Sequence, residues 1–402
     1  LLEPSLSMAT TLGMLRMLGE ASRCCIMTAT LSRGFTKMLE EQLENFETIT
    51  LDDFPKDKIT IKSLLPNKDK KRIQVIDRTI TANDVIQRHK NKTIVICNRV
   101  ENAQKLYQEL QKTHQEFQAL RGLRAENIIC LHSRFFDKDR KAKEQKLKKL
   151  FGKKANPDED AILISTQVIE AGMDISCSVM HTEISPINSF LQRAGRCARF
   201  ENETGEIFIY DILEIDEREK ITSQEPNDDD KKEIATINSK FLPYRSEIVE
   251  RSFAELKKYL TLDGDIPKLL VETVLTEFEK ENIRELKDRN FNHSYILESW
   301  HDCLKNNYRK TVRDIQSVEV VLIKEDQIGE VTKFPYSYQS ISIYKWSLVS
   351  WLKKISQNEG PKLFDNDYLV WKSTDFEDIF LENDEEAKYQ LKEVTDFAQI
   401  GG

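Results

Sequence analysis

The chain has 402 residues and a formal net charge of −8, with 39% hydrophobic and 32% charged residues. Such a chain has room for about two or three domains, and its acidic balance excludes a basic nucleic-acid coat, so any polyanion site must be a local patch. The seven cysteines show no C-x-x-C spacing, and the adjacent pair Cys24-Cys25 in an apolar run favours buried thiols in a reducing cytosol. No stretch is both long enough and apolar enough for a membrane span, so we expect a cytoplasmic protein.

Segments typical of helices and strands alternate through the first half of the chain. The expected helices cover residues 5–20, 32–45, 82–89, 100–113, 137–151 and 190–199. The expected strands cover residues 23–27, 48–52, 59–61, 72–76, 93–97, 127–131, 161–165, 177–182 and 206–210. This alternation is typical of an α/β fold with a doubly wound parallel sheet.

Polar side chains stand at the ends of several of these strands. In open α/β sheets, ligands bind outside the carboxyl ends of the strands, so several polar strand ends in one sheet indicate a binding site there. The residues concerned are Thr28 and Thr30, Asn98 and Arg99, His132 and Ser133, and Thr166.

Three arginines mark the segment 190–199, where we expect a short amphipathic helix. Arg193, Arg196 and Arg199 recur at i, i+3 and i+6, which places their guanidinium groups near one face without an acidic partner on it. A guanidinium matches phosphate oxygens in a bidentate fork. The pattern favours an anion such as phosphate over its alternative, a solvated basic face.

Other parts of a nucleotide site are missing from these 402 residues. No glycine begins a G-x-x-x-x-G-K-[ST] phosphate loop, and the pair Gly152-Lys153 is followed by Lys154 at the end of an expected helix. Asp211 and the acidic run 215–217 resemble a metal-binding strand end only superficially, so we expect no metal site. The chain alone should therefore not hydrolyse ATP efficiently.

Four motifs resemble those of a known family in order and in spacing. They are Thr28-Ala29-Thr30, His132-Ser133-Arg134-Phe135, the run STQVIEAGMD at 165–174 and the run QRAGRCAR at 192–199. Together they resemble the second-half motifs of superfamily 2 helicases, in the variant found in the CRISPR-associated helicase of type I interference systems. The resemblance is strong over residues 1–212 and weak beyond them.

The resemblance implies a RecA-like architecture in four parts. They are a remnant of a first RecA-like domain over 1–31, the second RecA-like helicase domain over 32–222, a charged linker over 223–235, and a helical linker with a smaller α+β accessory domain over 236–402. In the last part we expect helices over 236–260, 267–287, 296–308 and 343–355, strands over 318–323 and 340–344, and a partly disordered acidic tail over 375–393. The opening Leu-Leu-Glu-Pro resembles the segment that follows the family's Asp-Glu-x-His box, so the expected ATP loop, acidic box and nuclease domain lie elsewhere.

The resemblance also implies roles for the motif residues. Arg196 and Arg199 would be arginine fingers that reach the γ-phosphate, and Gln192 would position that phosphate or the attacking water. Asp174 would bind the nucleotide ribose or hold an arginine. The implied nucleotide-binding residues are Arg193, Asp174 and Gly172, the single-strand contacts are Thr166, Ser133, Arg134, Asn98 and Arg99, and the residues that couple nucleotide state to domain closure are Thr28 and Thr30.

The leading hypothesis is the C-terminal part of an ATP-dependent DNA helicase or translocase of CRISPR antiviral defence, an enzyme that is incomplete alone. It implies ATP and Mg²⁺ held mainly by the first helicase half. The implied partners are single-stranded DNA, that first half and the nuclease domain in cis or trans, and the CRISPR RNA-guided surveillance complex, with no membrane. Two alternatives stay open, a non-catalytic nucleic-acid or effector-docking module and an RNA-directed superfamily 2 motor. The lysine-rich segment 138–154 fits a solvated face and a DNA or partner contact equally well.

Overall fold

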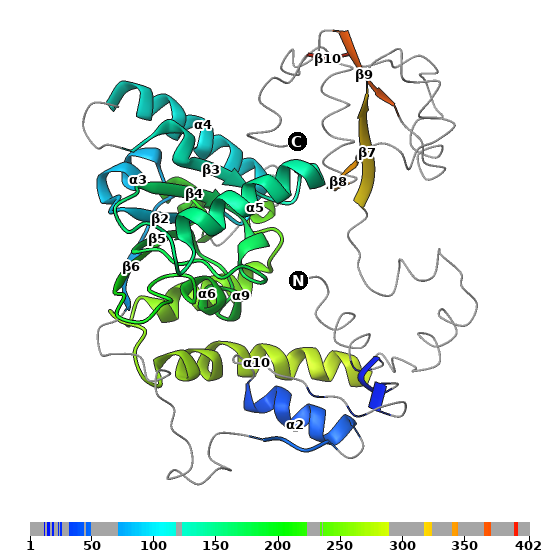
Figure 1. Cartoon of the computed structure of the whole chain (residues 1–402). Helices are drawn as coiled ribbons and strands as arrows, with labels where there is room; N and C mark the ends of the chain where they lie inside the picture. Colours follow the sequence, from blue (N-terminus) through cyan, green and yellow to red (C-terminus); the bar gives the residue numbers. More distant parts are fainter. Residues whose placement is uncertain are drawn as a thin grey trace. The chain divides into compact units, whose positions relative to one another are not determined.

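The computed structural model divides the chain into two compact units (Figure 1). One unit combines Leu1–Ile129 with Leu147–Asp314, and the other combines Cys130–Lys146 with Ile315–Gly402. The described residues are 12–25 in part, 32–43, 46–49, 71–117, 123–222, 234–288 apart from 235, and the strands at 317–323, 340–344, 366–370 and 390–392. Several predictions fall outside them: the coupling residues Thr28 and Thr30, most of the linker 223–235, the strand over 59–61 and the helix over 296–308. So does the helix predicted over 343–355 apart from Ile343 and Tyr344, which lie in a strand instead.

A six-stranded sheet has the strand order β1-β6-β5-β2-β4-β3 (Figure 1). The pairs β1–β6, β6–β5, β5–β2 and β2–β4 are all parallel, which confirms the predicted α/β fold with a parallel sheet. Each strand predicted between residues 72 and 210 is present, with small shifts at its ends. The strands are β1 (Lys71–Ile76), β2 (Lys92–Ile96), β3 (Ile128–Leu131), β4 (Ala161–Ser165), β5 (Val179–Glu183) and β6 (Gly205–Tyr210).

Helices lie on both faces of this sheet. Helices α3 (Ala82–Arg88) and α4 (Val100–Phe117) pack together and carry the chain across the sheet in one direction, from β1 to β2 and then to β3. Helix α6 (Ile187–Ala194) carries it the opposite way, from β5 to β6. Because crossovers between parallel strands are right-handed, opposite directions place these helices on opposite faces, as in a doubly wound fold.

Burial explains why the middle strands were predictable. Ile94–Ile96 of β2 and Ile162–Ile164 of β4 are fully buried, as expected of parallel strands that are covered on both faces. Strand β5 is different, because His181, Thr182 and Glu183 are buried polar residues near its carboxyl end. Buried polar groups need internal partners, so the end of β5 must be a hydrogen-bonded centre.

A second group of helices in the first unit packs around α6 and α10 (Ile266–Asp288). Helix α6 packs against α9 and α10, and α10 packs against α2 (Figure 1). Ser32 caps α2 as predicted, since its Oγ accepts a hydrogen bond from the Phe35 amide at 3.2 Å. The further elements are α2 (Arg33–Gln42), α5 (Asp137–Phe151), α7 (Ile215–Thr222), α9 (Ser246–Leu256), α10 (Ile266–Asp288) and the 3₁₀ turns η3 (Ala125–Asn127) and η4 (Gln167–Ile169).

The helix predicted over 236–260 is wrong in its extent. The regular helix α9 begins only at Ser246 and ends at Leu256. The chain then returns to the outer edge of the sheet, where the Leu262 amide donates to the Lys71 carbonyl of β1 at 3.0 Å. This pairing covers an exposed strand edge, and it takes Leu260 from the predicted helix, since the Leu260 carbonyl accepts from the Ile73 amide of β1 at 2.8 Å.

The second unit contains an antiparallel sheet with the strand order β10-β9-β7-β8. The strands predicted over 318–323 and 340–344 are confirmed. The two others were not predicted, because they are short and their sequences, NDYLV and QLK, lack a clear alternation. The strands are β7 (Ser317–Ile323), β8 (Ser340–Tyr344), β9 (Asn366–Val370) and β10 (Gln390–Lys392).

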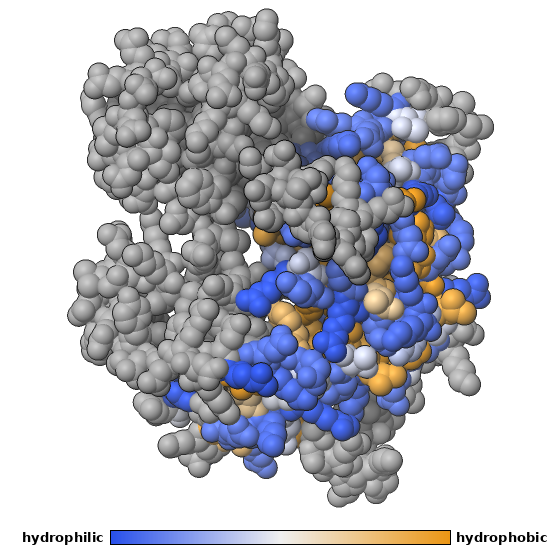
Figure 2. Space-filling model, turned by 180° about the vertical axis from the view of Figure 1, so that it is seen from behind, coloured by the Kyte–Doolittle hydropathy of each residue, from blue (hydrophilic) through white to orange (hydrophobic). Residues whose placement is uncertain are grey.

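Hydrophilic side chains cover much of the described surface, with hydrophobic residues scattered among them, as one face shows (Figure 2). Within the part of the chain that the structure describes, no helix combines the length and the apolar character that crossing a membrane requires. Four of the cysteines in that part, Cys97, Cys130, Cys177 and Cys197, are buried free thiols. Cys25 is exposed, so the burial expected for the pair Cys24-Cys25 is wrong at Cys25.

His181 makes fold stability depend on pH. Its ring stacks on Phe208 and Tyr210, and burial together with the charge of Arg88 lowers its pKa from 6.5 to about 3. Between these values the unfolded state binds more protons than the folded state, so stability falls as the pH falls. We expect acidification from pH 7.5 to pH 5 to remove about 2 kcal/mol through this group, measured by urea unfolding, and His181→Gln to lack this component. Equal pH dependence in both proteins would contradict this assignment.

Candidate functional site

The arginine segment is a helix end followed by a pinned loop, not the continuous helix predicted over 190–199. Helix α6 stops at Ala194, and the amides of Arg196 and Cys197 close tight turns onto Arg193 and Ala194. Cys197 then forms an isolated parallel bridge with Cys177. This tertiary pairing ends the helix, so Arg196 and Arg199 do not share a helical face with Arg193.

Gly205 allows this loop to lie close to the sheet. A Cβ atom at Gly205 would stand 2.4 Å from the Cys197 Sγ and 3.3 Å from the carbonyl oxygen of Ser178. Ala198 in the loop has a positive φ of 45°, a conformation that side chains disfavour. Its amide donates to the Cys177 carbonyl at 2.9 Å, which holds the loop in this shape. We call residues 195–200 the arginine loop.

Arg193 is fully buried and bound from all sides. A guanidinium has five N–H groups, and here each has an acceptor. The acceptors are Glu170 Oε1 (2.8 Å from Nε), Thr182 Oγ1 (3.0 Å), the Glu183 carbonyl (3.0 Å), Asn98 Oδ1 (2.9 Å) and the Tyr244 hydroxyl (3.0 Å). The expectation that the three arginines lack partners is therefore wrong, and Arg193 has no N–H left for a nucleotide.

Burial and neighbouring charges together set the pKa values of Arg193 and of the two glutamates around it. Burial alone would lower the pKa of Arg193, but Tyr244, Glu170 and Glu183 together raise it, so the guanidinium stays protonated. Burial likewise raises the pKa of Glu170, and Arg193 partly opposes that shift. Burial also raises the pKa of Glu183, against the hydrogen bonds from the Asn98 amide and the Asn102 side chain. The site is a charged centre at the carboxyl ends of β2 and β5.

Arg196 is held by neutral groups. Its Nε donates to the Ile169 carbonyl at 3.1 Å and its Nη2 to the Glu170 carbonyl at 2.7 Å. Burial lowers the pKa of Arg196, and the nearby positive charge of Arg199 lowers it further. Carbonyl oxygens orient this guanidinium without neutralising it, so it remains a focus of positive charge.

Arg199 forms the exposed part of the site. Its side chain is 40% exposed, and its Nε lies 2.5 Å from Asp174 Oδ1, whose side chain is 66% exposed. Gly172, two residues before Asp174, has a positive φ of 81° and open space around it, so it makes the turn that leads to Asp174. Gln192 is exposed on the last turn of α6. The contact between Asp174 and Arg199 matches one of the two roles expected for Asp174, which was to hold an arginine.

The residues expected to bind a single strand fall into two groups. Asn98 is 3% exposed, and both ends of its amide are used internally, by Arg193 and by the Ile184 carbonyl at 2.7 Å. Its predicted side-chain contact with nucleic acid is therefore wrong. Thr166 is also buried, directly after β4, whereas Arg99 is partly exposed beside Glu101. In the other unit, Ser133 is exposed and Arg134 partly exposed, just after β3.

Sequence analysis missed three residues of this site: Glu170, Glu183 and Tyr244. Glu170 lies inside the recognised run 165–174, but a lone glutamate there gives no indication that it faces an arginine. Glu183 could have been noticed as a charged residue in a strand that is otherwise buried, which is a signal for an internal partner. Tyr244 gives no such signal, because it reaches Arg193 only through the packing of α9 against α6.

No metal site accompanies these residues. Among the residues that the structure describes, no group of three or more His, Cys, Asp or Glu side chains could hold a metal ion. Asp211, which superficially resembled a ligand, is buried and binds Arg218 and the amides of Ile212 and Leu213. The Asp211 carboxylate therefore stabilises the fold through internal hydrogen bonds.

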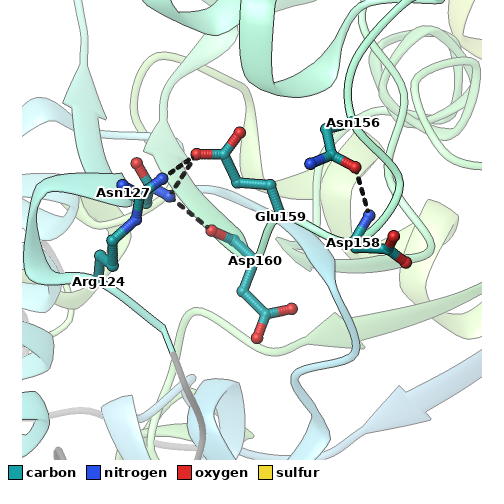
Figure 3. Close-up of a pocket in the computed structure, with 6 residues that line it drawn as sticks. All are labelled: Arg124, Asn127, Asn156, Asp158, Glu159 and Asp160. Carbon is teal, nitrogen blue, oxygen red and sulfur yellow. Dashed lines mark hydrogen bonds and ion pairs between the residues drawn. The ribbon is translucent and has the colours of Figure 1, made fainter.

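A polar hollow of about 430 Å³ lies at the amino ends of β3 and β4, away from the arginine loop (Figure 3). Glu159 points toward Arg124 and Asn127, and it forms an ion pair with the former. The Asn127 side chain also donates to the Asp160 carbonyl at 2.9 Å. Since the polar groups that line this hollow largely bind one another, we assign it no ligand.

Comparisons with known proteins agree with the fold and with the motifs. Residues 89–202 match the family model described as the C-terminal part of the CRISPR-associated nuclease/helicase Cas3. The Cas3 protein of Methanothermobacter thermautotrophicus is 24% identical over 399 residues, which cover 89% of this chain and 44% of that protein. The chain is thus similar to Cas3 proteins, and its residues 89–202 are similar to their C-terminal part. It spans less than half the length of that Cas3 relative.

Other Cas3 proteins show the same relationship over shorter or more distant matches. The Cas3 endonuclease/helicase of Escherichia coli is 32% identical over 105 residues, which cover 26% of this chain and 11% of that protein. The structure of T. fusca Cas3 with ADP has the same fold, with a TM-score of 0.54 and 15% identity over 91% of this chain and 52% of that chain. The matched segment 89–202 contains the arginine loop but ends well before Tyr244.

The buried position of Arg193 predicts a structural rather than a ligand-binding role. Arg193→Met should leave Glu170 and Glu183 without their cation and cost about 3–5 kcal/mol of stability, as expected when one partner of a buried ion pair is removed. Arg199→Met is the matched control, and its exposed ion pair should contribute about 1 kcal/mol or less. Urea unfolding of both variants measures the difference. A loss at Arg193 as small as that at Arg199 would contradict the structural role.

Proposed function

We propose that this chain is the C-terminal part of an ATP-dependent DNA helicase or translocase that acts in CRISPR defence. In this function the arginine loop forms one wall of a nucleotide cleft. The second wall, with the phosphate loop, the acidic box and Mg²⁺, comes from a first helicase half in cis or in trans. The observation that carries the proposal is the pair Arg196 and Arg199, two neighbouring positive charges of which Arg196 is 8% exposed and held by backbone carbonyls and Arg199 is exposed.

Arg196 and Arg199 suit the role of arginine fingers for a physical reason. A transferring phosphoryl group develops negative charge, and preorganised cations stabilise it without rearranging. The two carbonyl contacts of Arg196 fix its direction without an ion pair, although the nearby Asp174 partly offsets its charge. Arg199 contacts a single, largely exposed carboxylate, so a phosphate can compete for it. Gln192 would position the γ-phosphate or the attacking water, and Gly172 shapes the turn that presents Asp174.

Contacts with the DNA strand are assigned to residues that follow the ends of β2, β4 and β3. Arg99 and Thr166 are proposed contacts in the first unit, and Ser133 and Arg134 in the second. Arginine and hydroxyl groups bind phosphate oxygens without reading sequence, which suits a motor that must move along any strand. The proposed partners beyond DNA are a nuclease domain and the CRISPR RNA-guided surveillance complex, by analogy with Cas3 relatives.

Reconstitution of ATPase activity tests this function. The chain is mixed with a polypeptide that carries the phosphate loop and the acidic box of a Cas3 relative, and ATP hydrolysis is measured with single-stranded DNA or RNA. We expect DNA-stimulated activity that falls by about 10³-fold or more in Arg196→Ala and in Arg199→Ala, which is the range for arginine fingers. The chain alone should give no appreciable activity.

Arg124→Ala is the control for this experiment, because Arg124 also forms a surface ion pair, with Glu159 before β4, but contacts neither Arg196 nor Arg199. This variant should keep full activity. ATPase activity that is unchanged in Arg196→Ala and in Arg199→Ala would contradict their assignment as arginine fingers. Stimulation by RNA alone would favour an RNA-directed motor, and DNA binding without any restored hydrolysis would favour a non-catalytic module.

A further inference from the structure

Tyr244 connects the C-terminal helices to the arginine segment. It lies two residues before α9, is 5% exposed, and its hydroxyl is 3.0 Å from Nη2 of Arg193. Its ring lies beside the same guanidinium, with 6.0 Å from Cζ to the ring centroid. Nothing in the proposed function assigns a role to this residue, and it lies outside the segment that matches the Cas3 family model.

Glu170 connects Arg193 to Arg196 through its two ends. Its side-chain Oε1 accepts from Arg193 Nε at 2.8 Å, and that side chain is only 10% exposed. Its main-chain carbonyl accepts from Arg196 Nη2 at 2.7 Å. Since the carboxylate is held by a fully buried guanidinium, the carbonyl of the same residue is held as well. Arg196 therefore takes its direction from a residue whose place depends on Arg193.

We propose that Tyr244 is a positioning residue for Arg196, acting through Arg193 and then Glu170. The Tyr244 hydroxyl holds Nη2 of the Arg193 guanidinium, Nε of the same guanidinium holds the Glu170 carboxylate, and the Glu170 carbonyl orients Arg196. The catalytic consequence rests on the proposed function of Arg196, but the positioning itself does not. The segment before α9 thus contributes to the geometry of the arginine loop.

The chemistry of the contacts favours this relay over a simple packing role for Tyr244. A phenylalanine would fill nearly the same volume, so packing alone does not require the hydroxyl. Without the hydroxyl, one N–H of a buried guanidinium loses its acceptor, and Arg193 must shift to recover a partner. The turn that follows Glu170 contains Gly172 at a positive φ with open space around it. The backbone that follows Glu170 is therefore not held by packing at Gly172.

The positioning can be measured on the chain itself, without ATP hydrolysis. The Nε–H of Arg196 donates to the Ile169 carbonyl, so its proton should exchange slowly and give an observable NMR signal, assigned by its loss in Arg196→Lys. Tyr244→Phe and Glu170→Gln should shift this signal and raise the exchange rate of the proton by about tenfold. Each variant removes one contact that supports the buried hydrogen bond of Arg196, so that bond should open more often. An unchanged Arg196 signal in both variants would overturn the proposal.

Tyr107→Phe is the matched control. Tyr107 is also 5% exposed, and its hydroxyl accepts a hydrogen bond from Gln111 within α4. Loss of that hydroxyl should lower stability to a similar degree but leave the Arg196 signal in place. If Tyr107→Phe moves the Arg196 signal as much as Tyr244→Phe does, the effect is general loosening of the fold and the proposal fails.

The reconstituted ATPase then tests the catalytic consequence. Tyr244→Phe should lower kcat by about tenfold with little change in KM. A slightly misplaced Arg196 reduces the stabilisation of the transition state more than it reduces the binding of the substrate. In an Arg196→Ala background, Tyr244→Phe should have no further effect, since residues that act through one another are not additive. Equal losses in both backgrounds would show that Tyr244 does not act through Arg196.

The two proposals can fail separately. If Tyr244→Phe moves the Arg196 signal while Arg196→Ala leaves hydrolysis unchanged, the relay stands and the finger assignment is wrong. If Arg196→Ala abolishes hydrolysis while Tyr244→Phe changes neither the signal nor kcat, the finger assignment stands and the relay is wrong.

Discussion

A single buried charge determines how the carboxyl edge of this sheet is built. Taking a guanidinium fully out of water is costly unless every N–H finds an acceptor, and Arg193 meets that condition. Its acceptors come from the segment after β2, the end of β5, the turn after β4 and the segment before α9. Four stretches that are distant in sequence are thereby held to one point, and the arginine loop begins directly beside that point.

The buried charge also separates the three arginines into different tasks. Arg193 completes the interior, while the turn at Gly195 carries Arg196 and Arg199 out of the helix toward Asp174. The bridge between Cys197 and Cys177 fixes where the loop lies on the sheet. The short motif QRAGRCAR therefore contains both the buried anchor, Arg193, and the two arginines that it helps to orient, Arg196 and Arg199. This explains why the three arginines lie so close together in the sequence.

Local patterns were sufficient for the sheet and insufficient for the site. The strands at 93–97 and 161–165 and the helix at 137–151 were predictable because apolar runs and helical periodicity are properties of adjacent residues. The end of α6 was not, because a bridge to Cys177 decides it. The partners of Arg193 were not either, since Asn98 and Tyr244 are 95 and 51 residues away in sequence. The motif resemblance located the arginines, but only the packing shows which of them is buried.

The two outer arginines differ in what they give up when a phosphate approaches. The hydrogen-bond partners of Arg196 are neutral carbonyls. Whether or not these hydrogen bonds break when a phosphate binds, Arg196 gives up no ion pair and gains an anion. Arg199 must exchange an existing carboxylate for the phosphate, so the net gain is smaller. In the proposed cleft, Asp174 therefore keeps Arg199 in place while the cleft is empty, and the larger charge of a triphosphate can displace it. The exposed ion pair between Asp174 and Arg199 also makes nucleotide binding at the arginine loop sensitive to ionic strength, because salt screens exposed charges. Salt screens the buried charges around Arg193 much less.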